Sequence, residues 1–180
     1  MMMFSQLRIW LYLALLALLV MSCTPQGTTF VLDEDAPVQS MRDATIQYTD
    51  SGRLQMIVWG EEILNFDDED QTQEFPSYVK ATFYDERGRV TTIITADEGT
   101  SWQSKNLMNL RKNVVIRNLT DGTTTYTEDF YWDQDKAEIY SNVPVLQVRS
   151  DGTRQRGTGF RSDERMNNFV IFNPRFQAVL

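Results

Sequence analysis

The segment Asn113–Trp132, NVVIRNLTDGTTTYTEDFYW, decides the fold class because it has the pattern of two β-strands joined by a tight turn. Apolar and polar side chains alternate along its first half, as in a strand with one buried face. Thr120-Asp121-Gly122 supplies residues that favour a turn, and the chain then returns through a second alternating stretch. The side chains expected on the buried face are Val114, Ile116, Tyr126, Phe130 and Trp132. This segment therefore predicts an antiparallel hairpin.

The same pattern recurs on both sides of this hairpin. Strands are expected over residues 44–48, 54–59, 62–66, 78–84, 90–96, 113–119, 123–132, 136–141, 143–149, 153–160 and 168–172. No stretch in the chain after residue 42 shows sustained helical periodicity. Short strands at this spacing predict an all-β protein, either a sandwich, a jelly roll or a barrel. A loose hairpin repeat favours an elongated structure with open edges.

A second hairpin adds to the expected interior. Val79, Ala81 and Phe83 alternate with Lys80, and Ile94 lies on the strand that follows. With the first hairpin, this gives a predicted interior set of Val79, Ala81, Phe83, Ile94, Val114, Ile116, Tyr126, Phe130 and Trp132. Such a set fits a cavity for lipid chains, but apolar side chains on a sheet face also form ordinary closed cores. The sequence pattern leaves both interpretations open.

The N-terminus has the layout of an export signal. Arg8 precedes the apolar run Ile9–Met21, which ends at Ser22-Cys23. The run is short for a membrane span, which needs about 20 residues. Cys23 is the expected site of lipid attachment, although an uncleaved helical anchor is the alternative. We therefore expect a signal or anchor at 1–22, a lipidated Cys23 with a tether at 23–41, and one domain at 42–180.

Composition excludes most catalytic chemistry. The chain has no histidine and one cysteine, so neither Ser-His nor Cys-His catalysis is available, and we expect no cofactor and no metal. Its formal net charge of −8 argues against a nucleic-acid partner. The acidic groups Asp67–Asp70 and Asp133 with Asp135 are the candidates for glycoside hydrolysis or calcium binding. Asp67–Asp70 lacks the glycine and the spacing of a calcium loop, and both groups are more typical of solvated loops and turns. A binding protein is favoured over an enzyme.

Several short motifs resemble the LptC family of lipopolysaccharide-export proteins. They are Asn113-Val114-Val115-Ile116, Gly122, Thr127-Glu128, Phe130, Trp132-Asp133, Phe83-Tyr84-Asp85, Gly88, Ala96-Asp97 and Gly157-Thr158-Gly159-Phe160-Arg161-Ser162-Asp163. By residue pattern alone, Gly157-Thr158-Gly159 indicates a bulge or a close backbone approach. In order and spacing the motifs cover most of residues 42–172.

The resemblance implies a twisted, open β-jelly roll in the periplasm that accepts the acyl chains of lipopolysaccharide. It also implies two protein partners: the permease subunits of an inner-membrane ABC transporter and a periplasmic LptA-like bridge protein. We expect these partners to pair with the edges of the sheet, the transporter near Ala44, Ile46 and Tyr48 and the bridge protein near Phe169, Val170 and Ile171. The alternatives are a structural or adhesive surface lipoprotein with a closed core and, least favoured, a carboxylate enzyme.

Overall fold

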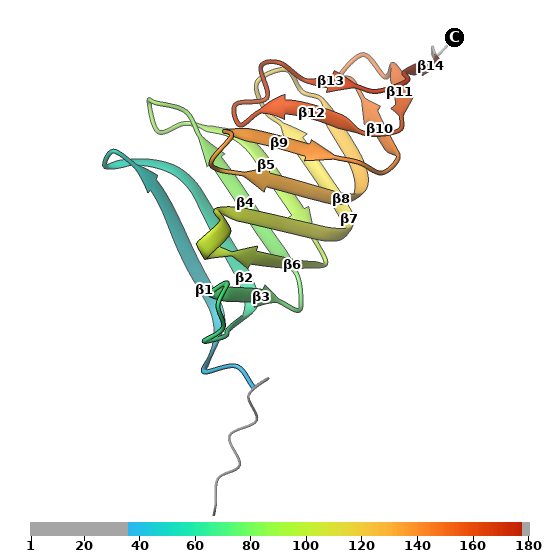
Figure 1. Cartoon of the computed structure of the whole chain (residues 1–180). Helices are drawn as coiled ribbons and strands as arrows, with labels where there is room; N and C mark the ends of the chain where they lie inside the picture. The colour runs from blue at the N-terminus through green and yellow to red at the C-terminus, as the bar shows by residue number, and fades with distance from the viewer. Residues whose placement is uncertain (1–35, 178–180) are drawn as a thin grey trace, which may run out of the picture. The chain divides into compact units, whose positions relative to one another are not determined.

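The structure, a computed structural model, describes residues 36–177 (Figure 1). The described residues belong to one compact unit, and they are built almost entirely of strands. The strands are β1 (Gln39–Asp50), β2 (Arg53–Asn65), β3 (Thr72–Phe75), β4 (Val79–Tyr84), β5 (Val90–Ala96), β6 (Glu98–Trp102), β7 (Leu107–Asn118), β8 (Thr124–Asp133), β9 (Glu138–Ser141), β10 (Val145–Val148), β11 (Arg154–Gly157), β12 (Phe160–Asp163), β13 (Val170–Ile171) and β14 (Arg175–Gln177). A single turn of 3-10 helix, η1 (Gln103–Lys105), lies between β6 and β7. The predicted all-β class is confirmed.

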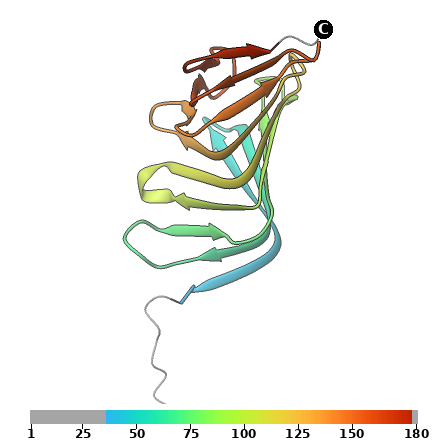
Figure 2. The same ribbon diagram turned by 90° about the vertical axis from the view of Figure 1, so that its right-hand side faces the viewer.

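The strands form one antiparallel sheet that folds back on itself into two halves (Figures 1 and 2). Half-sheet A is the hydrogen-bonded run β1-β2-β4-β5-β7-β8-β10-β11-β14. Half-sheet B is the run β1-β2-β3-β6-β7-β8-β9-β12-β13. The long strands β1, β2, β7 and β8 belong to both halves. Within residues 36–177, β1, β13 and β14 each pair on one side only, so the fold is an open, twisted β-jelly roll.

The long strands pass from one half-sheet to the other at a bend that we call the corner. In β1 the bend falls at Asp43, and in β7 it falls at Lys112 and Asn113; all three have positive φ values, between 49° and 62°. This backbone conformation is uncommon for residues other than glycine and breaks the regular pleat. Asn113 is held there by a hydrogen bond from its side-chain amide to Asp97. Figure 2 shows the sharp change of direction in these strands.

The corner also explains why β2 is one strand where the sequence predicts two, at 54–59 and 62–66. Gly60 lies at the bend, where a Cβ atom would come within 2.9 Å of both Ile63 and Phe75. Glycine therefore permits the close approach of the two half-sheets without interrupting the pairing of β2 with β1. The first strand likewise starts earlier than expected, at Gln39, because Gln39 pairs with Asn65 inside the predicted tether.

The interior between the half-sheets is filled by one apolar cluster, apart from a cleft at its open side. Its members, nearly all inaccessible to solvent, include Met56, Val58, Ile63, Phe75, Val79, Ile94, Leu110, Ile116, Phe130 and Phe160. We call the side opposite the corner, where the hairpin turns of both half-sheets end, the mouth.

Candidate functional site

The structure brings together all but one of the side chains predicted for the interior. The buried ones are Val79, Ala81, Phe83, Ile94, Val114, Ile116, Phe130 and Trp132. They come from both half-sheets and belong to the same cluster. Their proposed role in lipid binding stays a prediction.

Tyr126 is the exception, and its predicted interior position is wrong. Its side chain is 44% exposed, whereas Thr125 and Thr127 on either side of it point inward. The strand pairing shifts by one residue where β7 and β8 cross the corner, with Glu128 of β8 opposite the bulge in β7. Strict alternation across 126–132 therefore fails, and the inward positions change from odd to even numbers.

An aromatic cluster joins the two half-sheets near the mouth. Trp132 of half-sheet B packs edge-on against Tyr48 and Phe83 of half-sheet A, with ring centroids 5.4 and 5.8 Å apart. The indole N–H of Trp132 donates a hydrogen bond to Glu164, at 2.5 Å. Burial raises the pKa of Tyr48, and the nearby Ser101 hydroxyl partly offsets this rise. The two hydroxyls do not meet the geometry of a hydrogen bond, so the Tyr48 hydroxyl has no partner in the protein.

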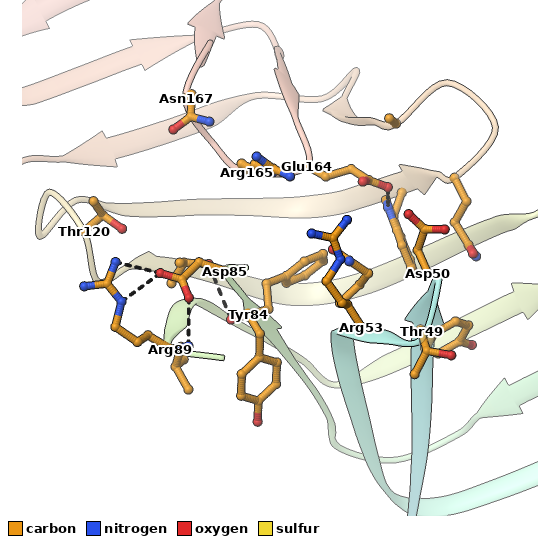
Figure 3. A pocket seen from close by; sticks show the side chains of 18 of the residues that line it. Thr49, Asp50, Arg53, Tyr84, Asp85, Arg89, Thr120, Glu164, Arg165 and Asn167 are labelled. Carbon is orange, nitrogen blue, oxygen red and sulfur yellow. Dashed lines mark hydrogen bonds and ion pairs between the residues drawn. The ribbon is translucent and has the colours of Figure 1, made fainter. Parts of the chain in front are cut away.

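A cleft of about 1020 Å³ opens at the mouth above this cluster (Figure 3). Its floor is aromatic, from Tyr48, Phe83 and Trp132, and its rim is charged. The rim side chains from half-sheet A are Asp50, Arg53, Asp85 and Arg89, and those from the β12–β13 loop are Glu164 and Arg165. An apolar floor below a charged rim is the arrangement that suits an amphiphile, whose chains avoid water while its head group remains solvated.

Two ionic contacts organise the rim. Asp85 accepts the backbone N–H groups of Arg87 and Arg89 and pairs with the Arg89 guanidinium at 2.7 Å, and the Arg89 backbone hydrogen bond contributes most to lowering the pKa of Asp85. Arg165 reaches across the mouth to Glu86 in the β4–β5 turn, at 2.9 Å. Both partners of the second pair are well exposed, so this contact between the two lips is weak.

The interior side chains form rows parallel to the mouth. The row nearest the mouth in half-sheet A is Tyr48, Met56, Phe83, Thr92 and Asn118. The corresponding row in half-sheet B is Asn65, Gln73, Ser101, Met108, Trp132, Ile139 and Ser162. These two sets, the mouth rows, mix aromatic and polar groups. The rows next to the corner are mainly apolar, so polarity falls with depth.

The predicted partner edges lie at opposite ends of the sheet. Ala44, Ile46 and Tyr48 are on the edge strand β1, with their side chains partly buried toward the interior. Val170 and Ile171 form the edge strand β13, where Val170 is 55% exposed. Phe169 is not on this edge, because its ring stacks on Phe160 at 4.6 Å and packs against the core. The sequence did not predict β14, which gives half-sheet A its own edge and carries the exposed Phe176.

Acidic residues of the two candidate clusters, Asp67–Asp70 and Asp133 with Asp135, make structural contacts within the protein. Asp68 accepts the backbone N–H of Thr72, and hydrogen bonds from Thr72 lower its pKa. Asp70 pairs with Lys105, and a hydrogen bond from Lys136 lowers the pKa of Asp133. A general acid needs the opposite shift, toward neutral pH. In the part of the chain that the structure describes, no group of three or more potential metal ligands occurs.

The expected anchor lies outside the described residues, and Cys23 with it. Over residues 36–177, no helix is both long and apolar enough to cross a membrane.

An open β-jelly roll with a layered interior and unpaired edge strands has the features of a binding protein. Comparison with known proteins identifies the family: the chain belongs to the LptC-related lipopolysaccharide-assembly family, whose sequence model matches residues 9–173. Proteins of this family are periplasmic, non-enzymatic components of lipopolysaccharide transport. A role in that transport bridge therefore follows for this chain.

Among solved structures, the chain is similar to LptH from Pseudomonas aeruginosa, described as the LptA-homologous periplasmic component of the lipopolysaccharide transport device. The TM-score is 0.44 and the sequence identity is 14%, over 82% of this chain and 97% of that one. No curated protein sequence matches the chain.

Proposed function

We propose that this protein accepts lipopolysaccharide from an inner-membrane ABC transporter, holds its acyl chains between the half-sheets and passes it to an LptA-like bridge protein. The observation that carries this proposal is the apolar interior, which extends through the sheet between two ends with unpaired edge strands. Burying an acyl chain there is favourable by about 0.8 kcal/mol per CH₂ and needs no acid, base or metal.

In the structure the deeper interior is packed, so acyl chains enter only if the half-sheets separate. The mouth is the side at which separation costs least, because few contacts join its lips: the aromatic packing of Trp132 on Tyr48 and Phe83, and the exposed Arg165–Glu86 pair. The side opposite is fixed by four continuous strands. We therefore infer that lipid enters from the mouth toward the corner.

Site-specific photo-crosslinking in cells tests the lipid site. A crosslinking residue at Phe83, Ile116 or Phe130 samples the mouth, the middle and the corner of the interior and should capture lipopolysaccharide. The same residue at Lys80 or Arg117, both exposed on the outer face, should not. Equal capture at both sets, or no capture at the interior set in folded protein, would contradict the proposal. The latter result would favour a structural lipoprotein with a closed core.

We further propose that the N-terminal segment anchors the protein to the inner membrane, through a lipid on Cys23 or through an uncleaved helix. The short apolar run that ends at Ser22-Cys23 supports lipid attachment. Intact-mass analysis of the membrane-extracted protein distinguishes the two. Retention of residues 1–22, or unchanged anchoring after Cys23→Ser, would rule out the lipoprotein form.

A further inference from the structure

Some buried polar side chains of the interior have hydrogen-bond partners in the protein, and others have none. Among the residues that the structure describes, five buried side-chain polar atoms have no hydrogen-bond partner in the protein: Tyr48 Oη, Asn65 Oδ1, Gln73 Oε1, Thr92 Oγ1 and Ser162 Oγ. All five belong to the mouth rows, two from half-sheet A and three from half-sheet B. Thr92 and Ser162 are at least 96% buried. They line opposite walls of the interior at the same depth.

Polar groups nearer the corner provide the contrast. Thr127 and Ser141 are equally buried, but their hydroxyls lie 3.0 Å apart and bond to each other, and the Thr127 hydroxyl also reaches the carbonyl of Pro144. Buried polar side chains are normally paired in this way, because an unpaired one loses its hydration without compensation. Five unpaired atoms at a single depth are therefore unlike the rest of this interior.

We propose that the mouth rows form a hydrogen-bonding belt for the polar groups at the junction between the head and the acyl chains of the bound amphiphile. This inference rests on the proposed function. It adds a chemical class: acyl chains that carry a hydroxyl or amide group near the head. With the chains directed toward the apolar corner rows, the junction of such a lipid lies at the depth of Tyr48, Thr92 and Ser162.

The atom types narrow this class further. The side-chain carbonyl oxygens of Asn65 and Gln73 only accept hydrogen bonds, so the ligand must supply donors. Hydroxyl and amide N–H groups are donors, whereas an acyl ester has none. The two carbonyl oxygens of the belt therefore favour hydroxylated or amide-linked acyl chains over the ester-linked chains of ordinary glycerophospholipids, whereas its three hydroxyls can pair with either kind of chain. Such discrimination is expected to be strong per group, because the lipid that lacks donors leaves buried acceptors unpaired.

Two synthetic probes test the belt: a phosphorylated glucosamine bearing one 3-hydroxytetradecanoyl amide, and the corresponding phosphorylated glucose bearing one tetradecanoyl ester at the same position, which has no free amine and the same charge. Equilibrium binding of each is measured with the full chain in a non-ionic detergent. We expect the hydroxy-amide probe to bind about tenfold more tightly, which corresponds to about 1.4 kcal/mol. Equal affinities would overturn the belt while leaving the proposed function intact. Binding of neither probe would overturn both.

Two nearly isosteric variants then separate a binding role from a structural one. Thr92→Val and Ser162→Ala remove the unpaired hydroxyls and should each weaken binding of the hydroxy-amide probe by roughly threefold to tenfold. The ester probe offers these hydroxyls only acceptors, so its binding should weaken less. Their thermal midpoints should stay the same or rise, because no protein hydrogen bond is lost. Thr82→Val, on the outer face of half-sheet A, is the matched control and should change neither affinity. Equal weakening of both probes, or a fall in the thermal midpoint, would overturn the belt.

Discussion

At the scale of single residues, Gly159 makes the closest approach to a backbone atom among the glycines that the structure describes. A Cβ atom there would lie 2.4 Å from the backbone carbonyl oxygen of Ser141, and one at Gly157 would lie 2.5 Å from that of Phe172. The sequence-based prediction of a close backbone approach at Gly157-Thr158-Gly159 is therefore confirmed. A backbone oxygen cannot rotate away as a side chain can, so both positions require glycine.

We expect Gly159→Ala to destabilise the protein by about 1–3 kcal/mol or more, because β9 and β12 must shift to admit the methyl group. Urea unfolding of the full chain measures this. Gly60→Ala is a suitable comparison, since the atoms nearest to its new methyl group would be side-chain carbons of Ile63 and Phe75, at 2.9 Å, and the nearest backbone oxygen is 3.3 Å away. Its loss should be smaller. Equal losses in the two variants would contradict the distinction between backbone and side-chain contacts.

Glu98 predicts a pH dependence of stability. Hydrogen bonds from Lys112 and then Arg111 lower the pKa of this carboxyl from its ordinary value of 4.5. A lowered folded pKa stabilises the protein above the unfolded value, and this contribution is lost as the pH falls through the folded value. The stability advantage of wild type over Glu98→Gln should therefore be fully present at neutral pH and shrink as the pH falls through and below 4.5. Glu61→Gln, at an exposed position without an ion pair among the described residues, is the control. A constant difference between wild type and Glu98→Gln would contradict the prediction.

At the scale of elements, the edge strand β13 is short and its outer face is exposed at Val170. A charge on an edge strand discourages pairing with another chain. We expect Val170→Glu to weaken binding to the LptA-like protein by about tenfold while leaving the unfolding transition unchanged. Val38→Glu places the same change on an exposed valine beside β1, at the opposite end of the sheet, and should leave this binding unaffected. Normal binding by the Val170 variant would instead favour β14 as the docking edge.

Alternation of side chains predicted most of these elements and the buried faces of β4, β5 and β7, because within one half-sheet each strand is regular. It failed at the corner, where the bulge opposite Glu128 reversed the faces of β8 and misplaced Tyr126. It also missed β3 and β6. Both strands are short, and their interior positions are occupied by residues such as Gln73, Gly99 and Ser101. These residues are not large and apolar, so the two strands show no apolar alternation in the sequence.

The polar belt could not be predicted from the sequence for a different reason. Thr92 and Ser162 are separated by 70 positions, and nothing local distinguishes them from the paired Thr127 and Ser141. Whether a buried hydroxyl has a partner depends on which strands lie opposite each other across the interior. That information exists only in the folded pairing of the half-sheets.

At the scale of the whole molecule, lipid entry through the mouth predicts that joining its lips blocks loading. Glu86→Cys and Arg165→Cys replace the partners of the ion pair that crosses the mouth, and a short bismaleimide would link them. We expect the linked protein to lose photo-capture of lipopolysaccharide at Ile116. Each variant that carries only one of the two substitutions, treated in the same way, should retain it. Undiminished capture in the linked protein would mean that lipid enters elsewhere, by an end of the sheet.

Because four strands cross the corner without interruption, they act as an elastic hinge between the two half-sheets. The half-sheets cannot slide apart as independent bodies, so any widening of the mouth bends β1, β2, β7 and β8 about residues such as Asp43 and Asn113. In the structure the interior of the hinge is packed, so we take this packed arrangement as the unstrained state of the four strands. In the proposed transport cycle, we expect the half-sheets to return to this packing when lipid leaves, so that the deeper interior of an unloaded carrier excludes both water and the chains of other lipids.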